Sequence, residues 1–261
     1  MLVVEWTLSD WTKVRPLFEK HRRGVGILLP ALDQARGHLW VDSLESPTVA
    51  RLLLSFLNAF AGDSSSQVAR DLVRMIEPMQ VVFGSDDGWT QLFKEVWGER
   101  LGVQPRAFFS PDSLDIEHLR ELRSQVPSGY SLERMDLDTI RKVDKRRAIH
   151  IPMFFGNSED FFNMGLAFCI KYEGKVVSMA STFTPYTDQF EIQVDTLDND
   201  HRRKGLATAV SAALIIHALE NGLTPHWDAA NEVSIHLALK LGYTDPDHWD
   251  AYYLKPLNGS D

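Results

Sequence analysis

Glu191-Ile-Gln-Val-Asp-Thr-Leu-Asp-Asn-Asp-His-Arg-Arg-Lys-Gly-Leu-Ala-Thr208 is the stretch of this chain that decides its fold. It opens with alternating polar and apolar residues, which predict a strand. A turn, three basic residues and a glycine follow, and then an apolar run without proline that predicts a helix from about residue 205 to 221. A helix start placed here offers free backbone N–H groups and the positive end of the helix dipole, which together favour an anion.

The basic turn suits a diphosphate. Arg202, Arg203 and Lys204 add full positive charges at the predicted helix start, while Gly205 and Ala207 leave little side-chain bulk before the backbone. The short pattern alone is weak, because a solvated basic helix end would show the same residues. The strand before it, and the strand, helix and Gly-aromatic pair after it, favour the anion site.

Composition narrows the class of protein. The chain has 261 residues, 44% of them hydrophobic and 24% charged, which is typical of a globular protein with one large domain or two small ones. Its net charge of −9 argues against a nucleic-acid partner. Neither a signal peptide nor a membrane span is predicted, so no membrane partner is expected.

The reactive side chains add two expectations. Cys169, the single cysteine, lies in an apolar run and is expected to be buried and inert, which fits a cytoplasmic protein. The nine histidines show no paired metal spacing, so no metal site is expected.

Turn residues at Val126-Pro-Ser-Gly129 predict a domain boundary, with an N-terminal α/β domain over 1–128 and a second domain over 129–261. The first domain alternates helix and strand patterns, including a helix over 11–23 and a short strand over 107–109. The second begins with a strand and a helix. Three antiparallel strands, the motif helix, a strand, a helix and a last strand over 249–254 follow. This order predicts a mixed α/β (α+β) sheet.

The spacing Arg202-x-x-Gly205-x-Ala207 and this element order resemble the GNAT acetyltransferase superfamily, whose coenzyme A pyrophosphate loop reads Gln/Arg-x-x-Gly-x-Gly/Ala. The resemblance covers residues 129–261. It implies a C-terminal GNAT fold that transfers acetyl from acetyl-CoA to an amine by direct attack in a ternary complex. The N-terminal half has a similar element order and is interpreted as a possible degenerate copy of that fold.

Four strings narrow the resemblance to the branch that includes the zwittermicin A resistance acetyltransferases. They are Gly205-Leu-Ala-Thr, Asn221-Gly-Leu-Thr-Pro, Trp227-Asp-Ala-Ala-Asn231 and Leu239-Lys-Leu-Gly-Tyr243.

The resemblance implies how coenzyme A would be held. The loop would take the pyrophosphate, the backbone edge of the preceding strand would take the pantetheine arm, and Asn231 would contact that arm. A helix cap is the alternative role for Asn231. The implied cofactor-binding residues are Val194, Asp195, Thr196, Arg202, Arg203, Lys204, Gly205, Leu206, Ala207, Thr208, Asn231 and Ser234.

The candidate residues for proton transfer are Glu191, Asp195 and Tyr243. The first two lie, together with Gln193, on one face of the predicted strand. Superfamily members often use a Glu on this strand as the base, which implies Glu191, with Asp195 behind it; a solvent-facing acid is the alternative. Many members carry a Tyr seven residues after the Asn, but this chain has Ala238 there. Tyr243 is then either the general acid or a packing residue at the helix end.

The acceptor is less defined. Phe154, Phe155, Phe161 and Phe162 crowd the loop after the first helix of the second domain, where the superfamily shapes its acceptor pocket; a core plug is the alternative. The acidic net charge favours a small cationic amine. A protein or peptide acetyltransferase and a non-catalytic coenzyme A sensor are the other functions that the sequence leaves open.

Overall fold

The computed structural model describes residues 3–257, and the chain divides into two compact units. Unit 1 consists of Met1–Arg106 and His248–Asp261 as far as they are described, and unit 2 of Ala107–Asp247. The predicted boundary at residue 129 stays a prediction. The helix before it, α5 (Ile116–Ser124), packs in unit 2 against α8 (Leu206–Glu220).

Unit 1 contains a mixed sheet in the strand order β1-β2-β3-β4-β5-β12, in which only β4 and β5 run parallel. Its elements in chain order are β1 (Val4–Glu5), α1 (Arg15–Phe18), α2 (Val25–Asp33), β2 (His38–Val41), β3 (Val49–Leu54), β4 (Leu57–Gly62), α3 (Gln67–Arg74), β5 (Val81–Gly84), α4 (Asp87–Trp97), the 3-10 turn η1 (Gly98–Arg100), the first part of β6 (Leu101–Ser110) and the end of β12 (Thr244–Leu254).

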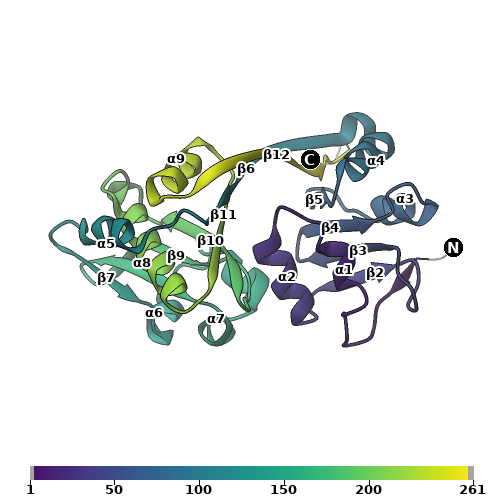
Figure 1. Ribbon diagram of the computed structural model, residues 1–261. Coiled ribbons are helices and arrows are strands. Elements are labelled where there is room, and N and C mark those ends of the chain that lie inside the picture. Colours follow the sequence, from purple (N-terminus) through teal and green to yellow (C-terminus); the bar gives the residue numbers. More distant parts are fainter. Residues whose placement is uncertain (1–2, 258–261) are drawn as a thin grey trace. The chain divides into compact units, whose positions relative to one another are not determined.

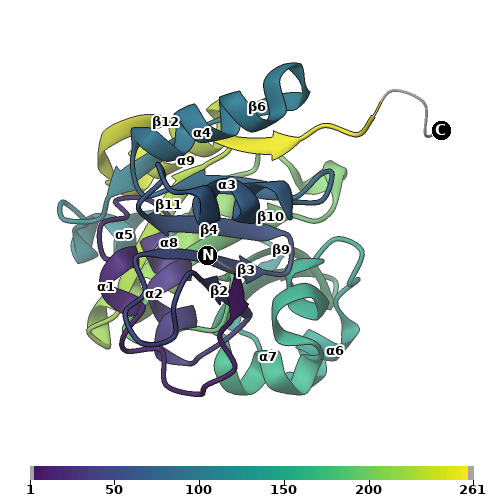
Figure 2. The same cartoon turned by 90° about the vertical axis from the view of Figure 1, so that its right-hand side faces the viewer.

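Helices α3 and α4 pack together over the sheet of unit 1 (Figure 2). The core beneath them is aromatic: the ring centroid of Phe60 lies 5.1 Å from that of Trp89 and 5.3 Å from that of Phe93. Each helix starts at a capping side chain, since Ser66 accepts from the N–H of Ala69 and Asp86 caps α4.

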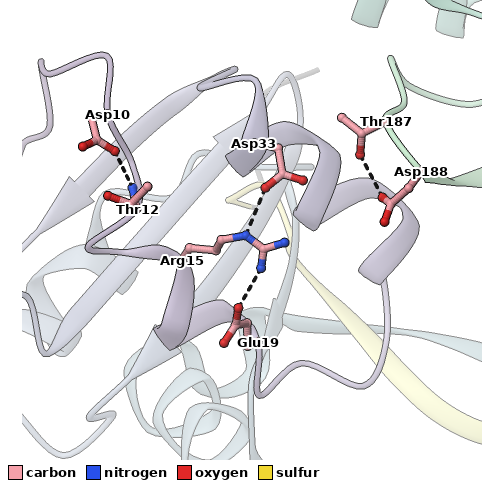
Figure 3. Close-up of polar contacts among 7 residues, drawn as sticks. All are labelled: Asp10, Thr12, Arg15, Glu19, Asp33, Thr187 and Asp188. Carbon is pink, nitrogen blue, oxygen red and sulfur yellow. Dashed lines mark hydrogen bonds and ion pairs between the residues drawn. The ribbon is translucent and has the colours of Figure 1, made fainter.

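The first helix of unit 1 is shorter than predicted. It covers Arg15–Phe18 instead of residues 11–23, because Pro16 fits only the first turn of a helix. A second helix, α2, follows, and the sequence did not predict it. Arg15 joins the two helices, since its guanidinium donates to Asp33 at 3.0 Å and to Glu19 at 2.7 Å (Figure 3).

Unit 2 contains a mixed sheet in the order β6-β11-β10-β9-β8-β7, in which only β10 and β11 run parallel. Its elements after β6 and α5 are β7 (Tyr130–Arg134), α6 (Leu137–Lys142), the π-helical turn η2 (Ile151–Phe155), α7 (Ser158–Met164), β8 (Ala167–Tyr172), β9 (Lys175–Thr182), β10 (Gln189–Thr196), the 3-10 turn η3 (Asn199–His201), α8, β11 (Thr224–Ala229), α9 (Glu232–Leu241) and the start of β12.

The sheet of unit 2 separates two layers of helices. Helices α5, α8 and α9 share buried clusters with one face of the sheet, and α8 is buried along most of its length. Helices α6 and α7 share a cluster with the other face, which also contains Cys169 and Met179. The predicted turn at Glu173-Gly174 is confirmed, with φ of 47° and 76°, both positive as a two-residue hairpin turn requires.

The order of elements along the chain repeats. The run from β1 to β6 has the same order as the run from β7 to β12, and α5 links the two runs. Each unit nevertheless receives its last strand from the other run: β6 pairs with β11 in unit 2, and β12 pairs with β5 in unit 1 (Figure 1). The final strand of each run is therefore exchanged. No helix of residues 3–257 has the length and apolar character needed to cross a bilayer.

Candidate functional site

Strands β10 and β11 separate partway along their length. Their parallel pairing runs from Gln189 opposite Thr224 to Glu191 opposite His226. Beyond that rung, residues 227–229 of β11 pair with β6, while β10 continues beside β9 to Thr196. The second half of β10 therefore has a backbone edge that β11 does not cover.

The open edge carries unpaired backbone groups. The backbone N–H of Leu197 donates to the carbonyl of Val177 at 2.8 Å. Hydrogen-bonded and non-hydrogen-bonded residue pairs alternate along an antiparallel ladder, so the odd-numbered residues in this part of β10 are the ones that bond to β9. The N–H and C=O groups of Val194 and Thr196 consequently point to the side that β11 has left. An extended ligand can add there as a strand.

The predicted anion loop has the backbone of an anion cradle. Arg202, Arg203, Lys204 and Gly205 are all exposed, and Arg203 and Gly205 adopt positive φ of 58° and 77°. Such left-handed residues turn successive N–H groups into a concavity. Gly205 precedes α8 and no side chain caps that helix, so the first-turn N–H groups stay available to a ligand.

Tyr130 anchors this loop to β7, a role that sequence reasoning missed. Its hydroxyl lies 2.8 Å from Nδ1 of His201 and accepts from Nζ of Lys204 at 3.2 Å. The Tyr130 and Tyr172 ring centroids are 5.0 Å apart. The contact holds the ammonium group of Lys204 beside Tyr130 of β7.

The corresponding segment of unit 1 lacks these features. Strands β4 and β5 stay paired as far as Phe60 and Gly84, and Ser85 extends the ladder by donating to Phe60 at 3.0 Å. The turn before α3 is Asp63-Ser-Ser-Ser66, without a basic residue, and Ser66 caps the helix. Unit 1 thus has no anion cradle at the repeated position, and β4 extends only to Gly62 beyond its last pair with β5.

Glu191 and Asp195 lie on one face of β10, as predicted. Ile192 and Val194 pack against the clusters beneath α8, so the alternating residues turn to the opposite face. Glu191 is only 5% exposed, whereas Asp195 is half-buried. The alternative of a solvent-facing acid at Glu191 is therefore not what the structure shows; its role as base stays a prediction.

His226 is a second functional candidate that sequence reasoning missed. It sits opposite Glu191 in register, and its Nε2 lies 3.0 Å from Oε1 of Gln189. Burial lowers the pKa of His226 to about 4. Only the strand pairing reveals this neighbourhood, because no spacing in the sequence links residues 191 and 226.

Asn231 and Ser234 lie at the start of α9. The side-chain oxygen of Asn231 accepts from the Ser234 N–H at 3.0 Å, and the Ser234 hydroxyl accepts from the indole of Trp227 at 3.1 Å. Asn231 is therefore a helix cap. Its amide nitrogen remains able to donate to a ligand, so the predicted contact with pantetheine stays open.

Tyr243 is fully enclosed in the core of unit 2. It is 1% exposed, its hydroxyl donates to the carbonyl of Pro225 at 2.9 Å, and burial raises its pKa well above the usual range. These contacts favour the packing role over that of a general acid. Ala238 is also buried, in the same cluster.

A Tyr243→Phe substitution distinguishes the two roles. We expect the free energy of unfolding to fall by about 1–2 kcal/mol, the usual cost of a lost buried hydrogen bond, and kcat to stay within a factor of two or so. Urea unfolding and steady-state turnover measure the two quantities. A drop in kcat of about 100-fold, with stability unchanged, would assign the proton to Tyr243.

The four phenylalanines divide between core and surface. Phe155 and Phe161 are buried with ring centroids 4.8 Å apart, whereas Phe162 is 48% exposed. A cavity of about 400 Å³ lies beside this segment, lined by Arg134, Asp136, Ile140, Phe161, Phe162 and Leu166. Cys169 is buried, as expected, and burial raises its pKa to about 12, so it stays a thiol. Among residues 3–257, no group of acidic, His or Cys side chains could hold a metal ion.

Substituting Gly205 tests the cradle. Gly205 and Gly174 have nearly the same φ, +77° and +76°, and a Cβ added at either residue would meet no atom within 4 Å. Gly205→Ala and Gly174→Ala should therefore each cost about 1 kcal/mol of backbone strain. We expect Gly205→Ala alone to weaken acetyl-CoA binding, by about tenfold, because only its Cβ would lie where the diphosphate approaches. Equal affinities for the two variants in calorimetry would contradict a cradle at Gly205.

Comparisons with known proteins agree with this geometry. Residues 15–252 match the family described as GNAT acetyltransferase. A GCN5-related N-acetyltransferase-like protein from Streptococcus suis is 30% identical, with a TM-score of 0.78 over 94% of this chain and 98% of that one. No curated protein matches significantly.

Two more distant structures share the fold. One is described as a tandem GNAT protein from the clavulanic acid biosynthesis pathway, at 14% identity and a TM-score of 0.62 over 96% of this chain and 98% of that one. The other is a GNAT-family acetyltransferase from Colwellia psychrerythraea, at 11% identity and a TM-score of 0.60 over 98% and 100%.

Proposed function

The chain belongs to the GNAT acetyltransferase family, and from this premise we propose that it transfers acetyl from acetyl-CoA to the nitrogen of a small-molecule amine. The observation that carries the proposal is the separation of β10 from β11 directly before the basic loop. An edge able to bind an extended arm and a cradle able to bind a diphosphate follow each other along one strand and turn, as the two parts of coenzyme A require.

The residues present fit coenzyme A. Backbone groups at Val194 and Thr196 would hold the pantetheine arm, and the N–H groups of residues 203–207 would hold the pyrophosphate. Arg202, Arg203 and Lys204 would supply charge at that point. The same N–H of Val194 or Thr196 is suited to stabilise the oxyanion that forms during attack on the thioester carbonyl.

Glu191 is the proposed base. A neutral amine attacks the thioester carbonyl; the C–N bond forms, the proton leaves the nitrogen for the Glu191 carboxylate, and the C–S bond breaks as the thiolate departs. A carboxylate that is 5% exposed is also shielded from bulk water, which strengthens its interaction with a cationic nitrogen. With Ala238 at the usual Tyr position, the thiolate leaves without a dedicated side-chain acid.

Unit 1 is proposed to be a degenerate copy of the same fold. Its repeated element order supports this, and so does the absence of a basic cradle at Asp63-Ser-Ser-Ser66. One coenzyme A site per chain is therefore expected, in unit 2. The exchanged strand β6 makes the N-terminal run part of unit 2, since Phe108 and Phe109 pair with β11.

The proposal also includes the branch of the family, the cellular compartment and the class of acceptor. Four strings, from residue 205 to residue 243, support membership of the branch that includes zwittermicin A resistance acetyltransferases. A single buried thiol supports a cytoplasmic enzyme. Proteins or peptides as acceptors, and a non-catalytic coenzyme A sensor, are the alternatives; Ala238 favours the sensor.

Calorimetry with acetyl-CoA, followed by thiol release with benzylamine, tyramine and spermidine, tests the proposal. We expect binding with a stoichiometry near one and release with at least one amine. Binding without release would favour a sensor or a protein acceptor. If acetyl-CoA does not bind, the basic loop is only a solvated helix end.

A further inference from the structure

Arg203 has an unfavourable backbone conformation in the middle of the basic loop. Its φ of 58° lies in the left-handed region, which is disfavoured by about tenfold for a residue with a side chain. Gly205, the other left-handed residue of the loop, adopts that conformation without this cost. The cradle depends on both residues, because left-handed residues turn successive N–H groups into one concavity. A strained conformation such as that of Arg203 persists where surrounding contacts hold it.

Tyr130 contacts residues on either side of Arg203. Its hydroxyl accepts from Nζ of Lys204 at 3.2 Å and lies 2.8 Å from Nδ1 of His201. An ammonium group only donates, so the hydroxyl hydrogen is available to Nδ1 and both hydrogen bonds can form at the same time. Donation from the charged group also polarises the hydroxyl and strengthens its bond to the imidazole. The side chains of residues 201 and 204 therefore meet at one oxygen atom, with Arg203 between them in the chain.

The sheet of unit 2 fixes the position of that oxygen. Tyr130 lies in β7 opposite Tyr172 of β8, and their ring centroids are 5.0 Å apart. The ring of His201 packs against both, with its centroid 5.5 Å from that of Tyr130 and 5.0 Å from that of Tyr172. Nζ of Lys204 lies 5.9 Å from the centroid of the Tyr130 ring, within the range of a cation–π interaction. Both loop side chains are thus attached to a paired strand.

We propose that the Tyr130 hydroxyl is a positioning group for coenzyme A: by bonding to His201 and Lys204 together, it keeps Arg203 left-handed and the cradle formed. This inference rests on the proposed function, in which the loop binds the diphosphate. A cradle that is formed for only part of the time binds with an affinity lowered by that fraction. Tyr130 acts in this role through the backbone of residues 203–205, and it stabilises the arrangement that the diphosphate requires.

Removing the hydroxyl tests this role. Tyr130→Phe keeps the ring contacts and loses both hydrogen bonds, so calorimetry should show about five- to tenfold weaker binding of acetyl-CoA. Turnover at saturating acetyl-CoA should stay within about twofold of wild type, because the bound ligand then holds the cradle. Tyr172→Phe is the matched control, since the Tyr172 side chain is partly exposed and its hydroxyl has no hydrogen-bond partner in the described part of the chain. Its affinity for acetyl-CoA should equal that of wild type.

A second pair of variants determines whether Tyr130 acts through Arg203. Arg203→Gly and Arg203→Ala remove the same charge, but only glycine adopts the left-handed conformation without cost. Adding Tyr130→Phe should weaken acetyl-CoA binding by about five- to tenfold in the Arg203→Ala protein and by less than about twofold in the Arg203→Gly protein. Each double variant is compared with its own single variant at residue 203, so the lost arginine charge cancels.

The outcomes separate this inference from the proposed function. Unchanged affinity in Tyr130→Phe, an equal loss in Tyr172→Phe, or an equal loss in the alanine and glycine backgrounds overturns the inference and leaves the acetyltransferase intact. The expected pattern of acetyl-CoA affinities without turnover of benzylamine, tyramine or spermidine supports the inference and counts against acetyl transfer to a small amine. If the wild-type chain does not bind acetyl-CoA, both are wrong.

Discussion

Reversing the charge at Arg202 and Lys204 together is expected to weaken acetyl-CoA binding by more than tenfold, and by up to about 1000-fold. Both residues lie in the exposed loop before α8, and their charges add to the first-turn N–H groups that no side chain caps. A hydrogen bond to a charged group contributes about 1.5–3 kcal/mol, so two of them account for this range. The fold should survive, because both side chains are exposed.

Lys20→Glu with Lys94→Glu is the matched control. Both lysines are exposed, both lie in unit 1, and the double substitution changes the net charge by the same amount. An effect of net charge alone would lower the affinity of both double variants and would disappear at high salt, whereas a loss of contacts at the loop would affect only the first. Equal loss of affinity in both, measured by calorimetry at 0.15 M salt, would mean that the loop does not contact the diphosphate.

The elements around this loop could be predicted because their signals are local. Alternation places β10, a proline-free apolar run places α8, and Glu173-Gly174 places the hairpin turn. The boundaries agree to within a residue or so. Each signal depends only on residues next to one another in the chain.

The strand exchange could not be predicted, because it depends on pairing between distant segments. Within the two exchanged strands, only residues 107–109 and 249–254 were predicted to be extended. The structure shows that β6 covers Leu101–Ser110 and that β12 covers Thr244–Leu254. Pro105 lowers the strand signal in β6, since proline is rare inside sheets. Periodicity gives the face of a strand but not its partner, so the neighbourhood of His226 and Glu191 was equally inaccessible.

Glu191→Gln is expected to lower kcat by about 100–10,000-fold and to leave acetyl-CoA affinity within about twofold of wild type. The amide cannot take the proton of the attacking nitrogen, and general-base catalysis typically contributes this factor. Coenzyme A would be held by backbone groups of Val194 and Thr196 and by the loop, none of which the substitution removes. Single-turnover acetylation and calorimetry measure the two quantities separately.

Asp195→Asn identifies which carboxylate is the base. Asp195 shares the face of Glu191 but is half-buried and lies further along the edge that β11 leaves open. If Glu191 is the base, Asp195→Asn should change kcat by less than about tenfold, because its contribution is limited to long-range attraction. A larger loss of kcat for Asp195→Asn than for Glu191→Gln would identify Asp195 as the base.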